Sequence, residues 1–245
     1  MNERQNNALD FLLYSYCSVS FSDLGEEVTD KVLGLLVDRA YKDASSHVLS
    51  ATPLLAKNPK EKAKDNIASK IKELKNNKGD YDNWHDQLCK DIIDTYTNDC
   101  SESTMSYGIA QKWVNMTMKN LMVVCDVAYL TDAANSKFVE EYGPLIEEYR
   151  KKFHVPVDSY IIDQSWPLKE DDKKTVALPL KDDKTKRDRE YKTPSSYVKA
   201  WSQWGNETYQ KFQESLREAL KESPIDWEGP AWIEQAKKRN RPKTN

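Results

Sequence analysis

Two residues that we place at the predicted starts of helices, Lys112 and Asp158, have side chains suited to chemistry on a carbon centre. A cation is disfavoured near a helix N-terminus, and a lysine amine held in its neutral form is a nucleophile. A carboxylate is favoured at such a place, where it can accept a proton or stabilise a developing positive charge. Each residue also has a structural interpretation: a solvated helix lysine, and the N-cap of a helix beginning at Ser159.

The segment before Lys112, Tyr107-Gly108-Ile109-Ala110-Gln111, is interpreted as a tight glycine-containing turn that leads into a helix. Such a turn exposes backbone N–H groups at the helix start. Together with the helix dipole, these groups can hold a DNA phosphate without reading the base sequence. The predicted contacts to a DNA backbone are Gly108, Ile109, Ala110 and Gln111.

The chain as a whole is predicted to be almost entirely helical, because apolar residues recur at helical spacing and only seven residues are glycine. The segment before Asp158, His-Val-Pro-Val, should be extended, since a residue that precedes proline avoids the helical region. A long excursion is expected at 167–193, with a short strand or hairpin as an option in 170–192. Helices are predicted at 5–17, 26–45, 58–75, 83–97, 109–129, 137–153 (broken or bent near Gly143-Pro144), from Ser159, from Pro194, at 206–222 and at 230–239.

The composition and the net charge of the chain limit the classes of function that we expect. The 245 residues carry a net charge of −3, which argues against a protein that coats nucleic acid non-specifically. No apolar run is long enough to span a bilayer and no signal peptide is recognised, so we expect a cytoplasmic protein without a membrane partner. The four cysteines and three histidines show no metal-binding spacing, and we therefore expect no disulfide framework, no metal and no cofactor.

The order of these features resembles the helix-hairpin-helix DNA glycosylase superfamily. That family carries Gly-h-Gly-x-Lys in its hairpin (h is apolar) and Val-Asp after an extended segment, and this chain has Gly108-Ile-Ala-Gln-Lys112 and Pro156-Val-Asp158. The resemblance covers about residues 83–166. Within the superfamily, this segment most resembles archaeal 8-oxoguanine glycosylases and bacterial anti-phage glycosylases. Two features depart from the pattern: Ala110 replaces the second glycine, and the interval between the lysine and the aspartate is longer than usual.

The resemblance implies an all-α domain over 1–245 with two helical lobes flanking a cleft, in which 83–166 supplies the helix-hairpin-helix and catalytic segment. It implies a monomer that binds double-stranded DNA and flips out one modified base, either oxidised or bulky. Lys112 would attack C1′ and Asp158 would assist, with strand cleavage as an optional second step. The residues predicted to line the base pocket are His154, Trp166, Trp113 and Trp84.

Two other functions remain open at the level of sequence. One is a helical DNA-binding module without catalysis, which keeps the hairpin for phosphate contacts alone. The other is an unrelated all-helical nuclease or interaction protein. A buried Lys112 that faces Asp158 would favour the glycosylase, whereas an exposed lysine far from the aspartate would favour a module without catalysis.

Overall fold

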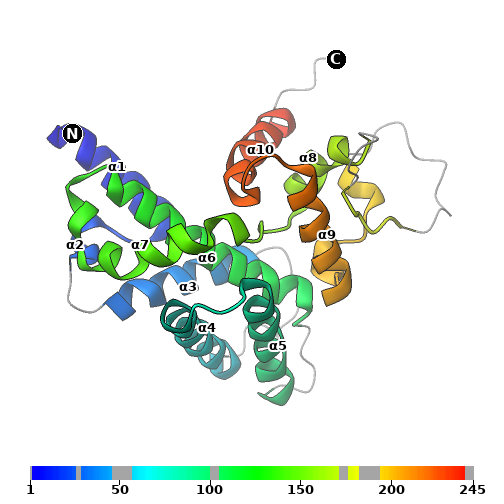
Figure 1. The fold of residues 1–245 in the computed structure, drawn as a ribbon, viewed down its shortest axis with the longest axis horizontal. Helices are drawn as coiled ribbons and strands as arrows, with labels where there is room; N and C mark the ends of the chain where they lie inside the picture. Colours follow the sequence, from blue (N-terminus) through cyan, green and yellow to red (C-terminus); the bar gives the residue numbers. More distant parts are fainter. Residues whose placement is uncertain are drawn as a thin grey trace. The chain divides into compact units, whose positions relative to one another are not determined.

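The fold is all-α, as the sequence predicts, in a computed structural model that describes residues 2–25, 29–45, 57–99, 105–170, 176–181 and 194–240 (Figure 1). Over these ranges ten α-helices and a few short 3-10 helices occur, and no sheet forms. The sole β-type pairing there is a single antiparallel bridge between Leu180 and Val198. Most of the optional strand or hairpin in 170–192 lies outside the described residues.

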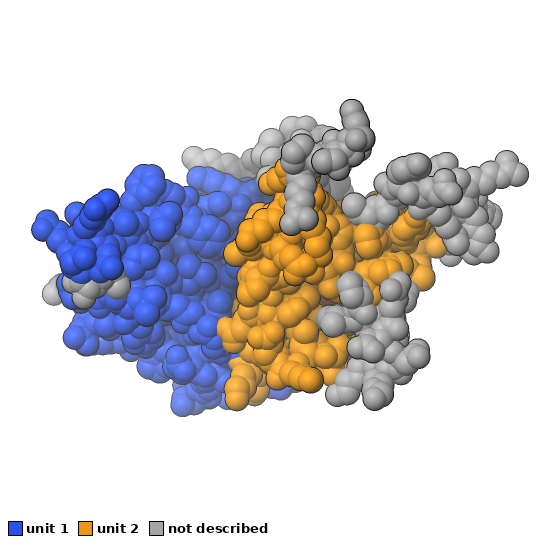
Figure 2. Space-filling view, turned by 90° about the horizontal axis from the view of Figure 1, so that it is seen from above, with its two compact units in different colours: residues 1–105, 110–150 blue, residues 106–109, 151–245 orange. Residues whose placement is uncertain are grey.

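The chain divides into two compact units (Figure 2). Unit 1 consists of residues 1–105 and 110–150, and unit 2 of residues 106–109 and 151–245. The segment 83–166 is therefore not one unit, because it runs through both. The arrangement of two lobes around a cleft remains a prediction.

Unit 1 is built from seven α-helices, of which α6 contributes all but its first three residues. The 3-10 helix Asp132–Asn135 follows α6, and the 3-10 helix Arg150–Lys152 follows α7 and continues into unit 2. The α-helices are α1 (Glu3–Cys17), α2 (Phe21–Leu24), α3 (Thr29–Ser45), α4 (Lys57–Asn77), α5 (Tyr81–Asp99), α6 (Tyr107–Tyr129) and α7 (Lys137–Tyr149).

The apolar stripes of these helices make the core of unit 1. Along α4, which is strongly charged, the side chains of Ala63, Ile67 and Ile71 are fully buried, so the helical period separates a core face from a charged face. Trp113 of α6 is also fully buried, and its indole N–H donates to the carbonyl of Val37 in α3 at 2.9 Å. Such packing fixes α6 within unit 1.

After Lys152, the described residues of unit 2 form three longer helices and two 3-10 turns of three or four residues (Figure 1). The α-helices are α8 (Ser159–Glu170), α9 (Asn206–Ala219) and α10 (Pro224–Arg239). The 3-10 turns span Pro194–Tyr197 and Trp201–Gln203. Helix α10 packs on α8, and the first 3-10 turn packs on α8 as well.

Several predicted boundaries need correction. Helix α7 continues through Gly143 and Pro144 to Tyr149 without a break. The helix predicted from Pro194 is only a four-residue 3-10 turn. Helix α10 begins at Pro224 rather than 230, because proline fits the first helical turn, where no N–H is needed.

Candidate functional site

Lys112 lies on α6 among an unusual set of buried polar residues. Its side chain is only 5% exposed, so the interpretation as a solvated helix lysine is wrong. On the same helix, Gln111 and Asn115 are fully buried, and the Asn115 amide donates to Gln111 Oε1 at 2.9 Å. Asn115 Oδ1 in turn shares a 2.9 Å hydrogen bond with Nε2 of His85, which is buried on α5. Buried polar groups are costly unless they are satisfied, so this row of residues constrains how α6 packs.

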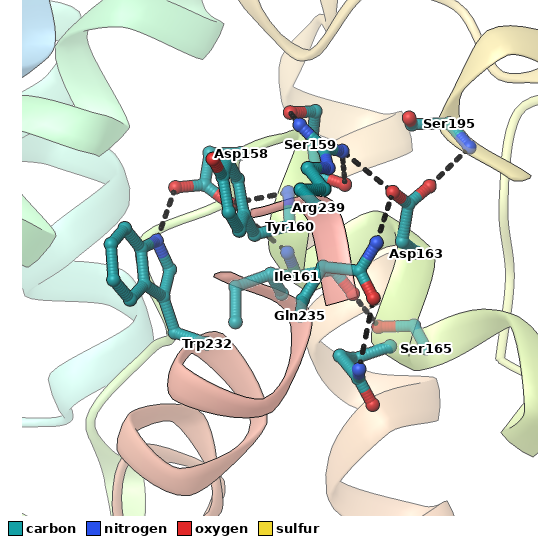
Figure 3. A network of polar contacts seen from close by, with 11 residues as sticks. Asp158, Ser159, Tyr160, Ile161, Asp163, Ser165, Ser195, Trp232, Gln235 and Arg239 are labelled. Atoms are coloured by element: carbon teal, nitrogen blue, oxygen red, sulfur yellow. Dashed lines mark hydrogen bonds and ion pairs between the residues drawn. The ribbon is translucent and has the colours of Figure 1, made fainter. Parts of the chain in front are cut away.

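Asp158 caps α8 as predicted. Its Oδ1 accepts the backbone N–H of Tyr160 at 2.9 Å and that of Ile161 at 3.0 Å. Its Oδ2 accepts the indole N–H of Trp232 from α10 at 3.3 Å (Figure 3). The residue is half-buried, so the carboxylate is fixed by donors from two helices without being enclosed.

The extended segment that leads to Asp158 is held by α9. Gln213 pairs through its side-chain amide with the backbone of Val155: Oε1 accepts the N–H at 3.1 Å and Nε2 donates to the carbonyl at 2.9 Å. His154 Nδ1 shares a 2.8 Å hydrogen bond with the Tyr209 hydroxyl. These buried bonds give the extended chain the partners that a sheet would otherwise supply.

An aromatic column stands beside the carboxylate, and we define it as Arg239, Tyr160 and Trp232 (Figure 3). The rings of Tyr160 and Trp232 are stacked with centroids 5.0 Å apart and planes 16° apart. The Arg239 guanidinium lies 4.0 Å from the centroid of the Tyr160 ring. Arg239 also forms a 2.6 Å ion pair with Asp163, whose side chain is only 2% exposed.

The predicted phosphate-binding residues are buried. Helix α6 begins at Tyr107, so Gly108 lies within its first turn, and no glycine in the described part of the chain has a positive φ. The predicted tight turn at Gly108 is therefore wrong. A Cβ at Gly108 would overlap the carbonyl oxygen of Trp201, so the absence of a side chain there serves packing within unit 2. Ile109, Ala110 and Gln111 are likewise 4% exposed or less.

The start of α6 is instead capped by Ser106. Its Oγ accepts the backbone N–H of Ile109 at 3.2 Å and donates to the carbonyl of Ser202. Part of the connection from α5 to α6, residues 100–104, lies outside the described residues. The helix-hairpin-helix element and its phosphate contacts therefore remain predictions.

The four predicted pocket residues have different surroundings. Trp113 is a core residue whose ring lies tilted against that of Tyr41, with ring centroids 4.8 Å and planes 60° apart. Trp84 donates its indole N–H to the carbonyl of Lys70 at 2.9 Å, which ties α5 to α4. In unit 2, His154 is 1% exposed, and Trp166 is half-buried with its ring 6.1 Å from that of Tyr197.

The structure does not bring these residues together in one unit. Lys112, Trp84 and Trp113 belong to unit 1, whereas Asp158, His154 and Trp166 belong to unit 2. Sequence reasoning missed Trp232, which binds Asp158, and Gln213, which binds Val155 in the extended segment before it. Their sequence neighbourhoods carry no signal of this, because both contacts join segments more than 50 residues apart.

The described part of the chain has neither a cluster of side chains for a metal ion nor a helix for crossing a membrane. No group of His, Cys, Asp and Glu side chains in those ranges could hold a metal ion. No helix there is long and apolar enough to cross a membrane. The cysteines Cys17, Cys89 and Cys125 are buried and reduced, and burial raises the pKa of the Cys17 and Cys125 thiols to about 12. Those two thiols are thus poor nucleophiles in the folded chain.

Comparison of the chain with protein-family models, with curated proteins and with solved structures finds no match.

Proposed function

We propose that this protein is a DNA glycosylase in which Lys112 is the nucleophile and Asp158 the assisting carboxylate. The observation that carries the proposal is the setting of Asp158. Two backbone N–H groups are enough for an N-cap, yet this carboxylate also receives an indole N–H from a second helix. A half-buried carboxylate oriented by three donors is suited to act on a ligand as well as to cap a helix.

Lys112 supports the proposal through its burial. A lysine that serves only for solubility extends into water, whereas this side chain is 5% exposed on a helix rich in buried polar groups. A lysine amine enclosed by protein atoms can be held in one position relative to the atom that it attacks, as a nucleophile must be. This burial differs from the exposed lysine that we expect in a module without catalysis.

The reaction follows from the two groups. The target nucleotide is flipped out of the duplex so that C1′ becomes accessible. The Lys112 amine bonds to C1′ while the N-glycosidic bond breaks, and the base leaves with the bonding electrons and takes up a proton. Asp158 stabilises the positive charge on the sugar and accepts a proton from the amine. Opening of the sugar ring then gives a Schiff base, which requires both groups to reach one sugar.

Borohydride trapping tests this proposal, because borohydride reduces a Schiff base to a stable covalent adduct. The protein is incubated with duplexes that each carry one modified base, including an oxidised guanine and a bulky modified pyrimidine. The wild-type chain should be trapped on at least one duplex, and Lys112→Gln should not be. Lys119→Gln removes a lysine from the same helix and is the matched control, which should be trapped like the wild type.

Asp158→Asn separates catalysis from capping, because asparagine caps helices about as well as aspartate. This variant should keep its thermal stability and its affinity for the duplex while base release slows about 100-fold or more. Trapping of Lys112→Gln at the wild-type level would refute the assigned nucleophile. Base release by Asp158→Asn at the wild-type rate would refute the assigned carboxylate.

A further inference from the structure

The indole of Trp232 holds the second oxygen of the Asp158 carboxylate. The backbone donors of α8 both bind Oδ1, so the cap by itself does not fix the direction of Oδ2. The terminal torsion of an aspartate has a broad energy profile, and such a carboxylate can swing about its Cβ–Cγ bond. The Trp232 N–H lies 3.3 Å from Oδ2 and opposes that swing. This distance is at the long end of hydrogen-bond range, so the constraint depends on how firmly the indole is held.

The aromatic column supplies that support. Trp232 is 39% exposed, which means that little of its position is set by enclosure in a core. One face of the indole stacks on Tyr160, and the other side of the column is formed by the Arg239 guanidinium. Stacked rings and a cation over a ring each stabilise such a contact beyond the area they bury. The indole is thus held by its stack.

The foot of the column is a buried carboxylate. Asp163 receives the Arg239 guanidinium at 2.6 Å, the Gln235 amide at 2.8 Å and the backbone N–H of Ser195 at 2.6 Å (Figure 3). Arg239 also donates to the hydroxyl of Ser159 at 3.0 Å. A buried acceptor with three donors permits few alternative arrangements, so the column has a fixed base.

From this arrangement we infer that Trp232 is a positioning residue for Asp158, with Tyr160 and Arg239 supporting it through the column. The inference rests on the proposed function only in taking Asp158 as the working carboxylate. Trp232 sets the direction of Oδ2 before a ligand arrives. Loss of its N–H should therefore slow the chemical step without weakening ligand binding.

The contact itself can be tested without any activity. In a ¹H–¹⁵N spectrum of the full chain, the seven tryptophans give seven indole N–H resonances, and Trp232→Phe identifies the one that belongs to Trp232. In Asp158→Asn the asparagine oxygen keeps the cap, and its NH₂ group faces the indole in place of Oδ2. The indole then loses its acceptor. Its resonance should move upfield by more than any other indole resonance, and an unmoved Trp232 resonance would overturn the inference.

The functional arm uses the trapped duplex and single-turnover base release. Trp232→Phe keeps a ring on Tyr160 and removes only the N–H, and we expect release to slow about 10-fold with duplex affinity within about 2-fold of wild type. Ile233→Ala changes an exposed neighbour on α10 and should behave like the wild type. A rate loss in Trp232→Phe matched by an equal loss of affinity or of thermal stability would overturn the positioning role.

The spectroscopic and the functional experiments distinguish a failure of the proposed function from a failure of the positioning role. If the wild-type chain releases no base from any duplex, the proposed function fails while the spectrum still reports whether Trp232 holds Asp158. If base release is normal and the Trp232 resonance ignores Asp158, the positioning role fails and the proposed function stands.

Discussion

At the scale of single residues, the bonds that orient Asp158 come from side chains that substitute for secondary structure. Gln213 is 1% exposed, and its amide satisfies both backbone groups of Val155, which is itself fully buried. A backbone N–H or carbonyl that loses its partner in the interior pays its full desolvation cost. The extended segment before Asp158 therefore depends on one glutamine of α9.

Replacing this glutamine should be costly. Gln213→Leu leaves the Val155 N–H and carbonyl without the amide, and we expect a loss of about 2–4 kcal/mol in the free energy of unfolding. Gln210→Leu alters the same helix at a half-buried position and should cost about 1 kcal/mol or less. Urea unfolding of both variants measures the difference, and equal midpoints would show that the amide pairing adds no stability.

At this scale, a contact can be predicted from the sequence when its two residues are close together along the chain. The Asp158 cap was predictable, because a cap and its helix are adjacent and the rule is local. The burial of Lys112 was not, since it depends on how α6 packs. The Trp232 contact joins residues 74 positions apart, and seven tryptophans offered no reason to single out this one.

At the scale of elements, helix α6 is the least expected one. Apolar periodicity predicted its body and its end at Tyr129, and the structure confirms both. Its start differs from the prediction, because the glycine at position 108 indicates a turn by sequence, whereas the helix already begins at Tyr107. A glycine in a helix costs about 1 kcal/mol relative to alanine, and here that cost is offset by contact between the helix backbone and Trp201.

Two glycine-to-alanine substitutions test this interpretation. In Gly108→Ala the new methyl meets the backbone of Trp201 and Ser202, which cannot rotate away, and we expect a loss of about 1–3 kcal/mol. Gly34→Ala lies in the interior of α3, where the new Cβ meets no atom within 4 Å outside its chain neighbours and its own helix, and it should gain about 0.5–1 kcal/mol. Differential scanning calorimetry should show shifts of opposite sign, and a stabilised Gly108→Ala would contradict the packing role.

At the scale of the whole molecule, sequence predicted the fold class and most helix positions. It did not predict that residues 106–109 belong with the second half of the chain, because that depends on contacts nearly a hundred residues apart. The ion pairs within unit 1 could not be predicted from the sequence either. Asp38 of α3 binds Lys60 and Lys64 of α4, and Glu141 of α7 binds Lys75 of α4 and Thr29 of α3.

These carboxylates should make unit 1 sensitive to acid. Burial alone would raise the pKa of Glu141, but the hydrogen bonds from Lys75 and Thr29 outweigh it and leave the pKa below its ordinary value of 4.5. The unfolded chain then binds a proton more readily than the folded one. The stabilisation is complete above pH 4.5 and is lost as the pH falls through the lower, folded value.

Glu141→Gln should therefore flatten the dependence of the melting temperature on pH between about 5 and 3, while lowering stability at pH 7 by about 1 kcal/mol or less. Glu140→Gln, at the exposed neighbouring position, should leave the pH profile unchanged. Thermal melts across this range measure both. A Glu141→Gln profile as steep as that of the wild type would show that the ion pair plays no part in acid unfolding.

Because residues 106–109 belong to unit 2, the start of α6 is synthesised well before the residues that it contacts. Ser106 and Tyr107 contact Ser202 and Gln210, which are 96 and 103 residues away. At a translation rate of about 5–20 residues per second, these partners leave the ribosome roughly 5–20 s after the start of α6. During that interval the N-terminal turn of α6 lacks its native contacts with Ser202 and Gln210.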